Sequence, residues 1–200
     1  MNKHFIFGLL VVAMCFSTPL YAQQTDANHY YIGAGASYAM ENFNSEFDDT
    51  WGINAKVGYH LHPQIDIEFD YNYLSGFEDE DKGELSGTPF ETNIEYEAET
   101  YMFVVKGYFP SPTEKARLGV IVGAGIMDVD ADAKLKVDGM SSSGGEHEAD
   151  LCGKVGLGVD LFPTQDISFG IEASYTFAEF DDLPENIEYF NFTAGIAYHF

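Results

Sequence analysis

The stretch WGINAKVGYHLHPQIDIEFDYNY, Trp51 to Tyr73, alternates apolar and polar residues on both sides of a tight turn. Its first half places apolar residues at every second position: Trp51, Ile53, Ala55, Val57, Tyr59 and Leu61. Its second half repeats the alternation with Ile65, Ile67, Phe69, Tyr71 and Tyr73. Only residues 62–64, which include a proline, separate the two halves. The stretch therefore predicts a β-hairpin whose strands have one apolar and one polar face.

The same alternation recurs along the chain and predicts eight strands, at 29–40, 51–61, 65–74, 95–109, 117–127, 149–162, 167–177 and 187–200. The connections alternate in length. Short turns occupy 62–64, 110–116 and 163–166, and longer polar loops occupy 41–50, 75–94, 128–147 and 178–186. This pattern is typical of an all-β, eight-stranded antiparallel up-and-down transmembrane β-barrel, with short periplasmic turns and four longer extracellular loops.

The first 22 residues have the features of a cleaved signal peptide. Lys3 and His4 precede an apolar run over 5–16, which is too short to span a bilayer, and Ala22 stands before the polar Gln23. We expect cleavage between Ala22 and Gln23, which leaves residues 23–200 as one barrel domain. Cys15 would leave with the peptide, so Cys152 would be the single cysteine of the exported chain.

Alternation alone does not say which face points outward, because a soluble lipocalin-like barrel places its apolar residues inside. Aromatic residues near the strand ends and many glycines in the polar set favour the membrane orientation. The polar set also carries charges of both signs, which can pair inside a lumen. The predicted lumen network comprises Lys56, Asp66, Glu68, Asp70, Lys106, Asp150, Lys154, Asp160 and Glu172.

One strand breaks the pattern. Glu95, Glu97 and Glu99 share parity with the apolar Tyr101 and Phe103. With Lys106 kept in the lumen, either these glutamates stand above the membrane or a bulge reverses the alternation.

The chain resembles the outer-membrane β-barrel family of OmpA-like and OmpX-like proteins, often labelled the porin family. The resemblance rests on GKVGLGVDLF at 153–162 before a proline turn, VKGYFP at 105–110, and the final strand FNFTAGIAYHF at 190–200. It implies Sec-type export to the outer membrane of a Gram-negative bacterium. It also implies that the outer-membrane assembly machinery reads the alternate C-terminal residues Phe192, Ile196, Tyr198 and Phe200.

The formal net charge is −24, and 25 of the 33 acidic residues lie in the four predicted long loops and their flanks. Such a rim repels nucleic acid and attracts divalent cations or basic partners, including cations that bridge lipopolysaccharide phosphates. Asp128, Asp130 and Asp132 superficially resemble the start of a calcium loop but lack its glycine and closing glutamate. We therefore interpret them as part of a solvated acidic loop.

Candidate catalytic and metal-binding groups are few. A triad could combine His147 with one of Ser141 to Ser143 and with Glu146 or Asp150, but the segment is more typical of a flexible loop. His60 and His62 share parity without an evident third ligand. We expect a monomeric structural or interaction protein in contact with outer-membrane lipid and lipopolysaccharide, without cofactor, metal or catalysis. The alternatives are a narrow ion-conducting barrel, a lipid A-modifying enzyme and a soluble lipocalin-like binder.

Overall fold

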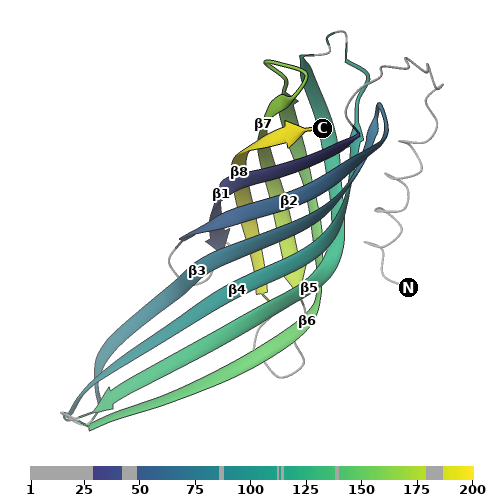
Figure 1. The fold of residues 1–200 in the computed structure, drawn as a ribbon. Helices are drawn as coiled ribbons and strands as arrows, with labels where there is room; N and C mark the ends of the chain where they lie inside the picture. Colours follow the sequence, from purple (N-terminus) through teal and green to yellow (C-terminus); the bar gives the residue numbers. More distant parts are fainter. Residues whose placement is uncertain are drawn as a thin grey trace.

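The computed structural model describes residues 29–41, 49–85, 88–111, 113, 115–137, 140–178 and 187–200. Eight antiparallel strands close into one barrel in chain order, with β8 paired to β1 (Figure 1). Their bounds are β1 Tyr30–Glu41, β2 Thr50–His62, β3 Ile65–Leu85, β4 Thr88–Tyr108, β5 Ala116–Val137, β6 Met140–Leu161, β7 Ile167–Ala178 and β8 Ile187–His199. The predicted all-β, eight-stranded fold is confirmed. The expected signal peptide and its cleavage site lie outside the described residues.

The two ends of the barrel differ. One end, here called the turn end, holds the short connections β2–β3, β4–β5 and β6–β7 and also the C-terminal Phe200. There the backbones of Tyr30 and Phe200 exchange two hydrogen bonds, with N···O distances of 3.1 and 2.8 Å. The opposite end is called the loop end. In the described ranges, no helix is both long and apolar enough to cross a membrane.

The outward face is apolar and the lumen is polar over most of its length. Phe103 and Leu151 on the outside are 70% and 75% exposed, whereas Asp66 in the lumen is 1% exposed. A lipocalin-like barrel has the opposite arrangement. The orientation is therefore the one that a lipid environment requires.

The middle strands are much longer than the alternation predicts. β3, β4, β5 and β6 have 21 or 22 residues each and run past their neighbours as a four-stranded sheet, here called the outer sheet (Figure 1). The predicted loops at 75–94 and 128–147 are therefore wrong: most of their residues belong to two hairpins. Their sequence lacks a continuous apolar face, so the alternation did not identify them as strands.

The irregular parity of the fourth predicted strand has a simple explanation. β4 pairs with β5 without interruption from Phe90 opposite Val137 to Tyr108 opposite Gly119, so no bulge lies between these two strands. Glu97 and Glu99 therefore continue the outward face of Tyr101 and lie beyond it. A bulge does occur in β3, between Leu74 and Phe77, where Gly76 adopts a φ of 79°.

Candidate functional site

The middle of the lumen holds a charge layer contributed by five strands. Lys106 Nζ lies 2.6 Å from Glu172 Oε1 and 2.8 Å from Glu68 Oε1. Lys56 Nζ lies 2.6 Å from the same Glu172 oxygen. Lys154 pairs with Asp70, which also accepts a hydrogen bond from the Asn54 amide. Three lysines thus balance three carboxylates across the lumen, which offsets the cost of burying charge.

The other three predicted lumen residues lie outside this layer. Asp66 and Asp160 lie nearer the turn end, where Asp160 accepts a hydrogen bond of 2.7 Å from the Tyr108 hydroxyl. Asp150 lies toward the loop end, half-buried, and accepts a hydrogen bond of 2.6 Å from the Leu151 backbone N–H. The structure therefore brings together six of the nine predicted residues.

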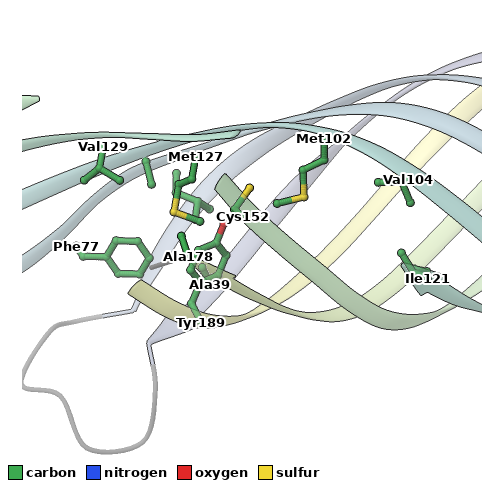
Figure 2. Close-up of a cluster of buried hydrophobic side chains, with 12 residues drawn as sticks. Ala39, Phe77, Met102, Val104, Ile121, Met127, Val129, Cys152, Ala178 and Tyr189 are labelled. Carbon is green, nitrogen blue, oxygen red and sulfur yellow. The ribbon is translucent and has the colours of Figure 1, made fainter. Parts of the chain in front are cut away.

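An apolar cluster lies in the lumen and extends from Ile121, which pairs with Lys106 of the charge layer, to Phe77 and Val129 in the outer sheet (Figure 2). The prediction of a polar lumen is wrong for this part. Met102, Met127 and Tyr189 are at most 1% exposed there, and Cys152 is buried with them. The sequence contained a sign of this cluster. At the loop-end inward positions of the predicted strands, such as Leu74 and Met127, apolar residues replace the polar ones found nearer the turn end.

The lumen leaves little free space. A cavity near the turn end has a volume of about 10 Å³, and its lining includes Tyr31, Asp66, Arg117 and His199. That volume is about one water molecule. Side chains therefore fill the described barrel interior, as expected for eight strands.

A hydrogen-bonded chain crosses the turn end. His60 Nδ1 lies 2.7 Å from Asp66 Oδ1, and His60 Nε2 lies 3.0 Å from His199 Nδ1. His199 Nε2 in turn lies 2.8 Å from Ser168 Oγ. Sequence reasoning missed this chain because its members come from four strands and no spacing connects them. His62 does not join His60 there; its Nδ1 accepts a hydrogen bond of 3.3 Å from the Gln64 N–H.

The outer sheet carries an acidic ladder, defined as Glu95, Glu97 and Glu99 of β4 with Asp132, Asp130 and Asp128 opposite them on β5. Carboxylates directly opposite each other repel. Two tyrosines from the outward face reach the ladder: the Tyr73 hydroxyl donates to Glu97 Oε2 over 3.2 Å, and the Tyr101 hydroxyl donates to Glu99 Oε2 over 2.5 Å. The ladder therefore begins directly beyond the outward-facing tyrosines.

His147 of β6 lies beside the ladder. Its Nδ1 is 2.8 Å from Asp130 Oδ1 and 3.2 Å from Asp128 Oδ1. The hydrogen bond to Asp130, followed by the negative charges of Asp128 and Asp130, raises the pKa of His147 above its ordinary value. The proposed serine partners lie farther along the strand, where Ser143 pairs with Lys134. His147 is thus engaged with carboxylates of β5.

The expected assembly residues lie on the outward face of β8 and at Phe200 directly after it. Phe192, Ile196, Tyr198 and Phe200 are 44% to 57% exposed. The Phe200 ring lies 6.2 Å from the Tyr30 ring and 6.3 Å from the Tyr198 ring. These contacts extend the apolar band across the junction of the first and last strands.

Comparison with known proteins agrees with this architecture. Residues 8–200 match the family described as outer membrane protein beta-barrel domain. No curated protein sequence matches the chain significantly. Similar solved structures include the attachment invasion locus protein Ail of Yersinia pestis, with 20% identity over 87% of this chain and 99% of that chain and a TM-score of 0.48. Neisserial surface protein A is 16% identical over 86% of this chain and 97% of that chain, with a TM-score of 0.47.

A third similar structure is the N-terminal barrel domain of Pseudomonas aeruginosa OprF. It has 13% identity over 86% of this chain and 99% of that chain, with a TM-score of 0.45.

Proposed function

Because the chain belongs to the outer membrane protein beta-barrel domain family, we propose that it is an outer-membrane interaction protein whose acidic ladder meets divalent cations and basic partners outside the cell. In this proposal the turn end faces the periplasm and the outer sheet stands beyond the outer leaflet. The barrel acts as a monomeric scaffold without catalytic activity. Its filled lumen favours this role over ion conduction.

The position of the ladder is the observation that supports the proposal. Glu97 and Glu99 lie on the outward, lipid-side face of the outer sheet, in hydrogen-bonding contact with Tyr73 and Tyr101. Tyrosines on the outward face of a membrane barrel lie at the level of the lipid headgroups. The ladder would then face lipopolysaccharide phosphates. Divalent cations would bridge the two sets of anions, and a basic protein segment would replace those cations.

Calcium titration of the refolded barrel in micelles, followed by calorimetry, tests the proposal. The variant Glu97→Gln/Asp130→Asn removes two ladder charges and keeps the side-chain shapes. Glu188→Gln is the matched control, because Glu188 also accepts a hydrogen bond from a tyrosine, Tyr175, but lies on β8 away from the ladder. We expect calcium binding to be lost in the ladder variant and kept in the control. Equal binding by both variants would contradict the proposal.

A second arm separates lipopolysaccharide from basic partners. Barrels in vesicles that contain lipopolysaccharide should retain it during washing with magnesium and release it with a chelator. A lysine-rich peptide should compete with magnesium for the ladder. Competition without cation-dependent retention of lipopolysaccharide would assign the ladder to basic partners alone.

Biogenesis is a separate part of the proposal. We infer that the signal peptide is removed between Ala22 and Gln23 and that the assembly machinery reads Phe192, Ile196, Tyr198 and Phe200. The outward exposure of these four side chains supports this inference, because none of them is needed to fill the lumen. Phe200→Ser should reduce the amount of barrel in the outer membrane more than it lowers the unfolding temperature of the assembled barrel. Normal yield would show that Phe200 is not part of the signal.

A further inference from the structure

The chain of hydrogen bonds at the turn end joins strands on opposite sides of the barrel closure. Asp66 belongs to β3, His60 to β2, His199 to β8 and Ser168 to β7. Between β2 and β8 lies β1, and its Tyr31 ring packs against both imidazoles, with centroid distances of 4.9 Å to His60 and 5.1 Å to His199. The contacts therefore cross the seam between the first and last strands from inside the lumen.

The distances permit one consistent direction of donation when both imidazoles are neutral. The Ser168 hydroxyl donates to His199 Nε2, His199 Nδ1–H donates to His60 Nε2, and His60 Nδ1–H donates to Asp66 Oδ1. Every nitrogen of the two rings then has a partner. Since each neutral imidazole has one donor and one acceptor, no other arrangement of neutral rings lets His60 donate to the carboxylate.

One additional proton reverses this direction without breaking the chain. His60 becomes an imidazolium beside Asp66, its Nε2–H donates to His199 Nδ1, and His199 Nε2–H donates to Ser168 Oγ. A second additional proton cannot be accommodated. It would place an N–H of each ring face to face across the present 3.0 Å between His60 Nε2 and His199 Nδ1, with both rings positively charged.

The surroundings make the second proton still less favourable. The two rings lie side by side and nearly parallel, with an interplanar angle of 4° and a centroid distance of 5.2 Å, so two imidazolium charges would lie close together. The Phe162 ring covers His199 with a centroid distance of 5.3 Å. Titratable and charged groups surround the two rings or line the cavity beside them. In the described part of the chain they include Tyr31, Lys56, Asp66, Glu68, Tyr108, Arg117, Asp160 and Asp166.

The hydrogen-bonded side chains of Ser168, His199 and Asp66 resemble a serine nucleophile with its base and carboxylate. The space around Ser168, however, does not suit a substrate. Ser168 is 4% exposed, and the cavity that it lines has a volume of about 10 Å³. A molecule larger than water therefore has no room beside the Ser168 hydroxyl. The arrangement is suited to holding and moving protons.

We propose that Asp66, His60, His199 and Ser168 form a proton-operated latch that fastens the barrel seam at its turn end, closed with at most one additional proton and released by the second. The latch is independent of the acidic ladder, which lies at the opposite end of the barrel. Because the folded state disfavours the second proton and the unfolded chain does not, acidification lowers the stability of the closed seam.

The unfolding temperature of the refolded barrel, followed by its heat-dependent migration on gels between about pH 7 and pH 4, tests the latch. This interval covers the range in which an ordinary histidine gains its proton. We compare the full-length barrel with His199→Gln, which cannot titrate, and with His29→Gln as a matched control. His29 is also at the turn end, but its ring contacts Tyr59 and not the latch.

The unmodified barrel and His29→Gln should both lose several degrees of unfolding temperature on acidification, and His199→Gln should lose much less. An equal loss in His199→Gln, or no loss in the unmodified barrel, would overturn the proposal. A purely structural role for His199 would lower stability by a similar amount at every pH and leave the pH profile unchanged.

A second measurement applies if His199→Gln does not assemble. Nitrogen-15 NMR of the histidine rings in the unmodified barrel should show His199 protonated at Nδ1 and not at Nε2 at neutral pH, with both nitrogens protonated only when the seam loosens. A doubly protonated His199 in a fully closed barrel would overturn the proposal.

Discussion

Replacement of Lys106 by methionine tests the charge layer most directly. Lys106 is 3% exposed and joins Glu172 and Glu68 through a single ammonium group. Without it, Glu172 keeps Lys56. Among the hydrogen bonds and ion pairs of the described residues, Glu68 then keeps the one from the Tyr31 hydroxyl, which donates to it over 2.5 Å. Removal of one partner from a buried ion pair costs about 3 to 5 kcal/mol, so we expect a loss of that size in the free energy of unfolding.

Two matched variants separate the missing charge from lost packing. Lys56→Met leaves Glu172 paired with Lys106. It should lower the free energy of unfolding by about 1.5 to 3 kcal/mol, the usual contribution of one hydrogen bond to a charged group. Lys106→Met/Glu68→Gln removes one charge of each sign and should be more stable than Lys106→Met alone, because no carboxylate is left without a cation.

Urea unfolding in lipid vesicles measures these differences. The single tryptophan of the chain, Trp51, is 64% exposed on the lipid-facing side, so its fluorescence reports when the barrel leaves the membrane. A stability of Lys106→Met within about 0.5 kcal/mol of the unmodified barrel would refute the reasoning, since changes of that size are typical of surface substitutions. So would a double variant less stable than Lys106→Met.

Two further predictions concern the lumen wall and the outer sheet. The pKa of His147 is raised in the folded protein, so the stabilisation from its contact with Asp130 is fully present below the ordinary histidine pKa and is lost as the pH rises through the pKa of the folded state. An NMR titration should show His147 releasing its proton at a higher pH than it does in an unfolded peptide. Gly58→Val should prevent assembly of a heat-stable barrel, because a Cβ at position 58 would lie 2.0 Å from the Tyr31 ring. Gly144→Val should be tolerated, because nothing lies within 4 Å of a Cβ at position 144.

The barrel could be predicted from sequence because lipid enforces a strict alternation. Every strand segment that touches lipid must be apolar on one face, and in this barrel the other face lines a mostly polar lumen. The alternation of apolar and polar residues from Trp51 to Tyr73 therefore predicted the β2–β3 hairpin. The outer sheet obeys no such rule. Residues such as Glu97 and Asp130 have water within reach, and the parity of charged residues alone did not distinguish a strand from a polar loop.

The seam latch illustrates a different limit of sequence reasoning. Ser168 and His199 are 31 positions apart, and His60 and His199 are 139 positions apart. Their meeting depends on the register of β7 against β8 and of β8 against β1, which alternation does not determine. The charge layer was easier to predict, because any set of opposite charges on one inward face must find partners inside a closed barrel.

The charge distribution separates the stability of this barrel from its interactions. The charge layer is balanced, with Lys56, Lys106 and Lys154 against Glu68, Asp70 and Glu172, so it contributes nothing to the net charge of −24. Most of the excess acid therefore lies beyond the charge layer, on segments such as the acidic ladder. Substitutions in the ladder should change what the surface attracts and leave the fold intact, because its carboxylates repel one another and their removal relieves that repulsion. Substitutions in the charge layer should lower the stability of the barrel and leave unchanged what its surface attracts.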